Sequence, residues 1–501
     1  MKVIMLMFDT LRRDLLPPYG NEEIEAPHFQ RLAEKTVTFD HCWAGSLPCI
    51  PARRELHTGR YNFLHRSWGP LEPFDDSMPQ ILKENGVYAH LVTDHQHYWE
   101  DGGGTYHSRY NSFEFIRGQE GDPWKGEVAE PEHPDYIGGH ENRNLIRQDW
   151  INRKYIRKEE EFPSVKTILR GLEFIEKNHG QDRWFLQIEC FDPHEPFHVP
   201  PKYMDLYPHD YHGPHFDWPS YGPVRETPEQ VVHCRSKYKA LLSMCDAYLG
   251  KVLDKMDELN LWEDTMLIVN TDHGILLGEH DGWGKCVQPL YNEVARIPLF
   301  IWDPRSKRAG VRNSCLVQTI DLAPTILDFF NIPIPKDMQG KPLRDTIAFD
   351  RPVREALLFG IHGGHVNCTD GRYVYMRGPV SKDNAPLYNY TLMPTHIRKF
   401  FEMDELRTAE FSEPFSFTKG LRTLRVNAFG KIGDRTVDMN QLGTMLFDIV
   451  EDPKQSRPIH DPEIENRMIR LMSRLMKESD APQEQYVRLG LQEFADFTSV
   501  K

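Results

Sequence analysis

The feature of the sequence that most constrains its fold is a series of short apolar runs, each leading into polar, chemically active side chains. The main runs span residues 2–8, 87–93, 184–189 and 265–271. Runs of this length without polar alternation are typical of strands buried on both faces of a parallel sheet. Amphipathic segments with helical periodicity, at 164–177 and 227–259, lie between them. The pattern therefore predicts an α/β fold with a large, mostly parallel central sheet flanked by helices.

Side chains suited to metal or anion chemistry follow these runs. In open α/β sheets ligands bind beyond the carboxyl ends of the strands, so residues at those places converge. Asp272 and His273 follow the last run, and Gly274 would let the backbone approach closely, which suits metal ligation. Asp9 follows the first run, where a binding role is favoured over helix capping. His194 lies between two prolines after the third run, and we expect it to be functional.

The segment from residue 49 to residue 60 carries the most unusual motif of the chain. Cys49 is followed by Pro51, which suits the first turn of a helix because proline has a fixed φ and no N–H. Cys49 therefore lies at a helix N-terminus, where free N–H groups and the helix dipole attract anions. Arg53 follows about one turn later and adds a fixed positive charge. The segment predicts a nucleophilic residue in an anion-binding pocket.

Together these motifs resemble the formylglycine-dependent (type I) sulfatases of the alkaline phosphatase superfamily. The resemblance rests on Cys49-x-Pro51-x-Arg53 with Thr58-Gly59-Arg60, on Asp272-His273-Gly274, on Pro193-His194-Glu195-Pro196 and on Lys285. It implies a divalent metal held by Asp9, Cys49, Asp272 and His273, and catalytic roles for Cys49, Arg53, His194 and Lys285. It also implies that a formylglycine-generating (sulfatase-maturating) enzyme converts Cys49 to formylglycine, whose hydrated aldehyde supplies the attacking oxygen.

The expected ligands leave a choice among divalent metals. Oxygen-rich ligation favours Ca²⁺. The resembled family usually has a second aspartate after the first metal ligand, and here that position is Thr10. One carboxylate fewer, together with the imidazole of His273, leaves Mn²⁺ or Zn²⁺ as alternatives.

The wall of the expected pocket departs from the family pattern. The family commonly places Lys-x-His after the second apolar run, whereas this chain has Asp94 and Gln96 at those positions. We expect the substrate to be bound by Asp94, His95 and His97, and by Arg143 from a long polar stretch typical of a binding loop.

The favoured function is hydrolysis of a sulfate monoester carried by a sugar or a small organic molecule. Phosphonate monoester hydrolases and phosphodiesterases of the same superfamily also use formylglycine, and they share a non-aspartate residue after the first metal ligand. Thr10 and the Asp272-His273 pair fit that alternative. A second alternative is a non-catalytic binding protein of this fold, for which the missing lysine at position 94 is a weak indication.

The chain is predicted to divide near residue 350. We expect residues 1–350 to form the α/β domain, and residues 351–501 a smaller α+β domain. Closely spaced strands at 356–359, 366–368 and 373–376 indicate an antiparallel sheet, and 461–476 a closing helix. Residues 380–440 have little periodicity, and we expect an extended arm there that could join copies of the chain into a homo-oligomer.

The bulk composition restricts the partners and the compartment. The 501 residues carry a formal net charge of −15, so neither nucleic acid nor an anionic membrane is an expected partner. The eight cysteines include no Cys-x-x-Cys pair, and no apolar run approaches the roughly 20 residues of a membrane helix. The N-terminus has no leader pattern. We therefore expect a cytoplasmic protein.

Overall fold

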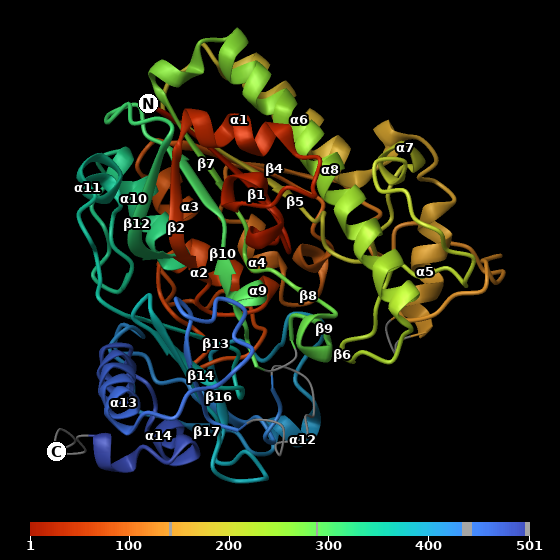
Figure 1. Ribbon diagram of the computed structural model, residues 1–501. Coiled ribbons are helices and arrows are strands. Elements are labelled where there is room, and N and C mark those ends of the chain that lie inside the picture. The colour runs from red at the N-terminus through yellow and green to blue at the C-terminus, as the bar shows by residue number, and fades with distance from the viewer. Residues whose placement is uncertain (140–142, 287–288, 433–442, 496–501) are drawn as a thin grey trace.

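The computed structural model describes residues 1–139, 143–286, 289–432 and 443–495, and its centre is a nine-stranded sheet (Figure 1). The strands are β1 (Lys2–Phe8), β2 (Val37–Trp43), β3 (Tyr88–Thr93), β4 (Ser112–Phe115), β5 (Trp184–Cys190), β7 (Thr265–Asn270), β10 (Arg296–Ile297), β11 (Leu299–Trp302) and β12 (Val311–Gln318). Their order is β10-β2-β11-β7-β1-β5-β3-β4, and β12 pairs with β2. Strands β4, β3, β5, β1 and β7 run parallel to one another. Strand β10 pairs antiparallel with β2, and β11 pairs antiparallel with both β2 and β7. The predicted mostly parallel sheet is confirmed.

Helices cover both faces of this sheet, because alternate residues of its buried strands point to opposite sides. One side of β1 (Val3, Met5, Met7) packs in a cluster with α2 (Cys49–Thr58), α3 (Met78–Glu84) and α10 (Leu322–Phe329). The other side (Ile4, Leu6, Phe8) packs with α1 (Pro27–Lys35), α6 (Pro163–Asn178) and α8 (Pro228–Glu258). All seven residues of β1 are buried. The core therefore fixes the carboxyl end of β1 between two helical layers.

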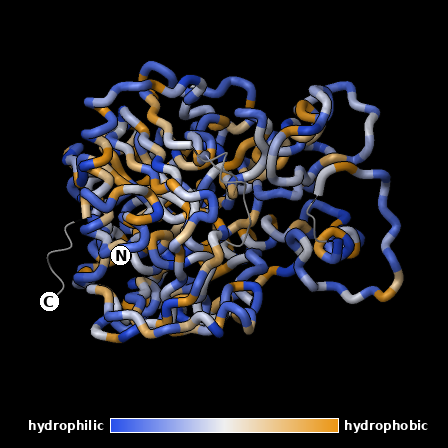
Figure 2. Tube along the Cα trace, turned by 90° about the horizontal axis from the view of Figure 1, so that it is seen from below, coloured by the Kyte–Doolittle hydropathy of each residue, from blue (hydrophilic) through white to orange (hydrophobic). Residues whose placement is uncertain are grey.

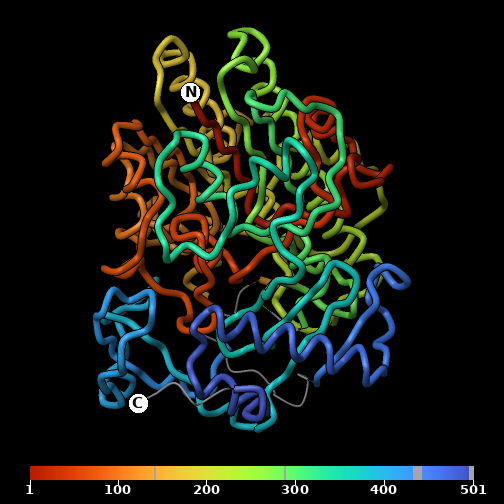
Figure 3. Tube along the Cα trace, turned by 90° about the vertical axis from the view of Figure 1, so that its left-hand side faces the viewer, coloured from red at the N-terminus to blue at the C-terminus, as the bar shows by residue number. Residues whose placement is uncertain are grey.

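The C-terminal part forms a separate antiparallel sheet, which lies below the main sheet in Figures 1 and 3. Its strands, in order, are β13 (Leu357–Gly360), β14 (Val366–Thr369), β15 (Tyr373–Arg377) and β19 (Met445–Asp448). Helix α13 (Pro462–Glu478) packs Met468 and Met472 into the same hydrophobic cluster as this sheet, and α14 (Gln483–Leu489) follows. The expected antiparallel sheet is confirmed, and a helix closes over it.

Residues 380–432 differ from the expected extended arm. They form a small antiparallel sheet of β16 (Tyr388–Thr391), β17 (Glu410–Phe411) and β18 (Leu424–Asn427), with α12 (Met403–Leu406) beside it. The segment packs on the main part, since the Tyr390 amide donates to the His65 carbonyl at 2.9 Å and the Gly102 amide to the Ile397 carbonyl at 2.8 Å. Strands this short carry little periodicity, so the sequence did not indicate them. The rest of the expected arm, 433–440, lies outside the described residues.

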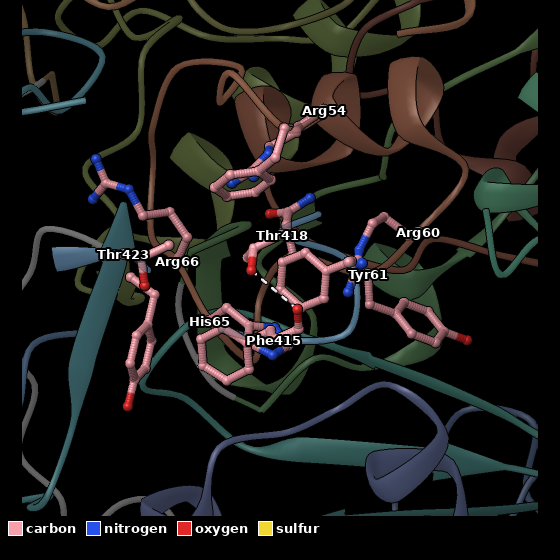
Figure 4. A pocket seen from close by; sticks show the side chains of 12 residues that line it. Arg54, Arg60, Tyr61, His65, Arg66, Phe415, Thr418 and Thr423 are labelled. Carbon is pink, nitrogen blue, oxygen red and sulfur yellow. Dashed lines mark hydrogen bonds between the residues drawn. The ribbon is translucent and has the colours of Figure 1, made fainter. Parts of the chain in front are cut away.

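A small cavity of about 10 Å³ lies where this segment meets the main part (Figure 4). Its lining includes Arg54, Arg60 and His65 from one side and Phe417 from the other. The Arg60 guanidinium lies 3.3 Å above the centre of the Phe417 ring, and Arg54 is held by two hydrogen bonds to Asp75. Its described lining includes neither Cys49 nor Arg53 nor the Asp272-His273 pair. The cavity is thus a feature of the junction between the two parts.

A lobe around α5 (Arg143–Arg153) and α7 (Pro201–Met204) projects beside the main sheet and is traced mostly in polar residues (Figure 2). A three-stranded sheet of β6 (Gly222–Pro223), β9 (Gly282–Gly284) and β8 (Leu276–Leu277) lies near it. The remaining α-helices of the described chain are α4 (Gly104–His107), α9 (Asn292–Ala295) and α11 (Arg344–Phe349). Across the described ranges, no helix has both the length and the apolar character needed to cross a membrane.

Candidate active site

Four potential metal ligands meet at the carboxyl end of the central strands. Asp9 follows β1, and Asp272 and His273 follow the neighbouring parallel strand β7 with one intervening threonine. Cys49 opens α2. One ligand atom from each of these four side chains lies within 4.8 Å of all the others, and all four residues are buried. The structure therefore brings together the metal ligands expected from the sequence.

His273 is oriented so that one ring nitrogen faces the other ligands. Its Nδ1 lies 2.9 Å from the Gly274 carbonyl oxygen. A carbonyl oxygen only accepts hydrogen bonds, so Nδ1 carries the ring proton and donates it. The lone pair of Nε2 therefore points into the cluster, 3.3 Å from the Cys49 Sγ. Burial lowers the pKa of His273, which keeps the ring neutral. Two carboxylates, a neutral imidazole and a sulfur atom at one buried point fit a divalent cation.

Arg53 joins three carboxylates in the interior. Its Nη2 donates to Asp9 at 2.8 Å, its Nη1 to Asp272 at 2.6 Å and its Nε to Glu189 at 2.8 Å. The guanidinium is only 1% exposed. One helical turn separates Arg53 from Cys49, whose carbonyl oxygen also accepts a hydrogen bond from Nη1 at 2.9 Å. A fully engaged guanidinium of this kind positions the carboxylates and neutralises part of their charge.

Glu189 is a site residue that the sequence analysis missed. It lies inside β5 and is completely buried, although a charged side chain is rarely buried without a partner. Besides Arg53, its carboxylate accepts hydrogen bonds from the Tyr98 hydroxyl at 2.9 Å and from the Gln187 amide at 3.0 Å. The available signal was a glutamate within an otherwise mostly apolar buried run.

Asp9 and Thr10 form the turn that follows β1. Burial alone would raise the pKa of Asp9, but Arg53 and nearby nitrogen groups outweigh that effect and hold it well below its usual value. The Thr10 hydroxyl donates to Asp9 at 2.5 Å, and the Thr10 amide donates to Asp272 at 3.1 Å. Thr10 has φ of +66°, an unusual conformation for a β-branched residue. The turn thus orients two ligand carboxylates without supplying a third.

Lys285 follows β9, His194 lies in the loop after β5, and both side chains lie beside Glu195. The Lys285 ammonium donates to the Thr10 hydroxyl at 3.0 Å and lies 3.4 Å from the Glu195 carboxylate. The His194 ring packs on Phe191 with ring centres 4.0 Å apart, and its Nδ1 is hydrogen-bonded to the Glu195 carbonyl oxygen. Burial is the largest influence on His194 and lowers its pKa to about 3. Both predicted residues are therefore present in the site, with His194 uncharged at neutral pH.

The expected substrate-binding residues occupy different places. His95 is at the cluster, with its Nε2 3.5 Å from the Asp9 carboxylate. Asp94 lies behind it and accepts hydrogen bonds from Ser164 and from the Phe191 amide, each at 2.7 Å. His97 turns toward Glu100, at 2.6 Å.

Two features distinguish the outer members of this set. Burial raises the pKa of Asp94 to about 6, and its hydrogen bonds hold the wall of the site in place. Arg143 is exposed at the first residue of α5, outside the buried cluster. Substrate contacts by His95, His97, Asp94 and Arg143 remain predictions.

The family of this chain is shown by a family model that matches more than half of its residues. A family model described as Sulfatase matches residues 2–332, which contain all of the clustered side chains. The chain belongs to the sulfatase family. Among curated relatives of this sulfatase, an arylsulfatase from Clostridium perfringens (strain 13 / Type A) is 24% identical over 388 residues, covering 69% of this chain and 78% of that protein.

Solved structures share the fold of this sulfatase over nearly its whole length. The phosphonate monoester hydrolase of Agrobacterium radiobacter has a TM-score of 0.67 and 17% identity, with 95% of each chain covered. A structure in complex with its substrate D-glucosamine-2-N,6-O-disulfate has a TM-score of 0.64 and 14% identity, covering 95% of this chain and 97% of that one. At these identities the similarity shows the alkaline-phosphatase-like fold, as expected from the motifs.

Proposed function

We propose that this chain is a sulfuric ester hydrolase that cleaves a sulfate monoester of a sugar or of a small organic alcohol. The observation that carries the proposal is the buried meeting of Cys49 with Asp9, Asp272 and His273, beside Lys285, in a chain of the sulfatase family. A nucleophile position, a metal-binding set and a lysine ammonium at one point are the components needed to attack and stabilise an anionic ester.

The residues divide the work by their contacts. Cys49, converted to formylglycine by a maturating enzyme, supplies a hydrated aldehyde as nucleophile, and a bound divalent metal would lower the pKa of its hydroxyl. Arg53 is saturated by carboxylates, so it keeps the ligand set in place. Lys285 follows β9 and donates to the Thr10 hydroxyl beside the metal-binding set, and it would bind an oxygen of the ester group. His194 and His95 are the nitrogen groups placed to handle the proton of the leaving alcohol.

Ca²⁺ is the metal that we favour, with Mn²⁺ or Zn²⁺ as alternatives. Two of the four donor side chains are carboxylates, which supports Ca²⁺, while the His273 nitrogen also suits a transition metal. A metal that binds only the folded state stabilises it and raises the Tm. The added free energy of unfolding is about 2.7 kcal/mol when the metal concentration is 100 times the Kd. When metal-free protein is titrated with each ion, the ion that binds at this site should raise the Tm. The same ion should leave the Tm of the Asp272→Asn variant unchanged.

A combined measurement tests the proposal. Peptide mass spectrometry of protein from its natural host should find Cys49 with oxygen in place of sulfur and two hydrogens. The same preparation should hydrolyse an aryl sulfate, and Asp272→Asn should abolish the activity. A stoichiometric thiol at Cys49 in active protein would contradict the formylglycine proposal, and absence of turnover in modified protein would favour the binding-protein alternative.

A phosphonate monoester hydrolase or phosphodiesterase is the second candidate function. The observation in its favour is Thr10, which orients Asp9 and Asp272 by hydrogen bonds where the family usually has a carboxylate. Paired rate measurements on an aryl sulfate and an aryl phosphonate ester distinguish the two candidates. Faster turnover of the phosphonate would reverse the ranking.

We further propose that the protein works in the cytoplasm. No disulfide joins the cysteines in the described part of the chain, which suits a reducing compartment. Fractionation of the natural host, followed by immunodetection, tests this location. Detection only in a secreted fraction would overturn it.

A further inference from the structure

Glu195 places a buried negative charge beside the cation that faces the ester. Its carboxylate lies 3.4 Å from the Lys285 ammonium, and its other oxygen accepts a hydrogen bond from the Tyr221 hydroxyl. The side chain is 2% exposed. Burial by itself would raise the pKa of Glu195, but the neighbouring Lys285 ammonium and the hydrogen bond from Tyr221 help to lower it below its usual value. The carboxylate is thus held in its charged form, next to the site and outside the metal-binding set.

Glu195 changes the net charge of the site by one negative unit. The contacting carboxylates are Asp9, Asp272, Glu189 and Glu195, and the contacting cations are Arg53 and Lys285. Four negative and two positive charges leave two negative charges, which a divalent metal would cancel. Without Glu195 the loaded site would be positive, as suits a doubly charged anion. With Glu195 it is neutral before the substrate arrives.

We propose that Glu195 restricts the site to singly charged ester groups, so that sulfate monoesters are accepted and doubly charged phosphate monoesters are rejected. This inference rests on the proposed function, because it takes Lys285 as the contact of the ester oxygens. An oxygen bound to Lys285 lies within roughly 6 Å of the Glu195 carboxylate, about two hydrogen-bond lengths. At that distance and an effective dielectric constant of about 20, one added negative charge lowers binding by a factor on the order of 100.

The same charge affects the product. Hydrolysis turns a singly charged sulfate ester into sulfate, which is doubly charged at neutral pH. Glu195 therefore repels the product more than the substrate and favours its release. Residues that merely support the fold would not distinguish ligands of equal shape by their charge.

The experiment compares Glu195→Gln with the unmodified sequence on ligands that differ in charge. At pH 8 an aryl phosphate is a dianion, since its second pKa is about 6. The ratio of kcat/KM for aryl phosphate to that for aryl sulfate should rise at least about 10-fold in the variant. The Kd of sulfate, measured by calorimetry, should fall relative to the Kd of methanesulfonate by a similar factor.

Two matched variants separate charge from positioning. Tyr221→Phe removes the hydrogen bond to Glu195 and keeps the charge, and Glu195→Asp shortens the side chain and keeps the charge. Both should leave the two ratios within about 3-fold of the original values. Equal ratios in Glu195→Gln and the original protein would overturn the inference. If no aryl sulfate is hydrolysed by modified protein, the proposed function fails, while the calorimetric comparison still decides the role of Glu195.

Discussion

Arg53 forms ion pairs with three carboxylates that come from three neighbouring strands of the main sheet. Asp9 and Asp272 follow β1 and β7, Glu189 lies within β5, and each accepts a hydrogen bond from a different nitrogen of the Arg53 guanidinium. A lysine has a single ammonium and could not reproduce this fork. Breaking a buried ion pair on one side typically costs about 3–5 kcal/mol. The carboxylates therefore depend on Arg53 for their geometry as well as for their charge.

Glu55, on the same helix, gives a pH-dependent contribution to stability. Its carboxyl group accepts hydrogen bonds from the Ser46 amide at 2.6 Å and the Thr319 hydroxyl at 2.8 Å, yet burial raises its pKa from 4.5 to about 8. Between about pH 4.5 and pH 8, Glu55 is therefore protonated in the folded state and ionised in the unfolded state. The resulting stabilisation is complete below pH 4.5 and is lost as the pH rises toward 8.

Glu55→Gln removes this titration and nearly keeps the shape. We expect the free energy of unfolding of the variant, relative to the original protein, to increase steadily from pH 5 to pH 8. Urea unfolding at several pH values measures the difference. Parallel stability curves for the two proteins across this range would show that Glu55 is ionised in the folded state.

The convergence of the four candidate metal ligands was predictable because each lies close to a strand end or a helix start that the local sequence marks. Asp9, Asp272 and His273 have neighbours in sequence that identify a strand end, and Cys49 has Pro51 to mark a helix start. Glu189 was not predictable in this way, because its partners Arg53 and Tyr98 come from distant segments. A sequence pattern reports local geometry, whereas the pairing of buried charges depends on how the strands are ordered in the sheet.

At the scale of elements, a tight turn after β3 fixes the wall that carries His95 and His97. The turn contains three consecutive glycines, Gly102 to Gly104, of which the first two are packed against backbone. A Cβ at Gly103 would lie 2.0 Å from the His97 carbonyl oxygen, and one at Gly102 would lie 2.4 Å from the His396 carbonyl oxygen. The glycines therefore permit close approach of three chain segments.

Gly103→Ala should displace the backbone that carries His95. Overpacking of this kind costs about 1–3 kcal/mol, so we expect a loss of that size in the free energy of unfolding. We also expect a lower kcat/KM, because His95 faces Asp9. Gly104→Ala is the matched control, since its Cβ would meet no atom within 4 Å and it opens α4. Equal effects of the two substitutions on stability and activity would refute the role of close packing.

The strands and long helices were predictable from periodicity, and the small elements were not. The apolar runs at β1, β3, β5 and β7 and the stripes of α6 and α8 carry strong patterns. Strands β16, β17 and β18 have two to four residues each, too few to show a period of two. Their structure comes from packing against the main part, through contacts such as that of Tyr390 with His65.

At the scale of the whole molecule, large exposed apolar side chains gather in one stretch of the C-terminal part. Phe400, Met403 and Phe411 are 67%, 65% and 65% exposed. Val380 and Phe429 of the same stretch are 64% and 50% exposed. Single exposed apolar residues are ordinary, but several within one small segment are typical of an interaction surface.

We expect this segment to join two copies of the chain. Light scattering across a range of concentrations should give a mass above that of one chain, and Phe400→Ser combined with Phe411→Ser should return it to one. Leu169→Ser, on α6 of the main part and 40% exposed, is the control that should leave the mass unchanged. A single-chain mass for the original protein at all concentrations would rule out self-association.

If Cys49 is converted to formylglycine as proposed, the burial of α2 makes the conversion compete with folding. All ten residues of the helix are buried, and Cys49 itself is 2% exposed. The proposed converting enzyme could reach the thiol only while the helix is still undocked. The yield of active molecules is then set by the ratio of two rates, and a chain that folds first keeps its thiol permanently. Slowing the docking of α2, for example by lowering the temperature of synthesis, would raise the modified fraction without any change in the site.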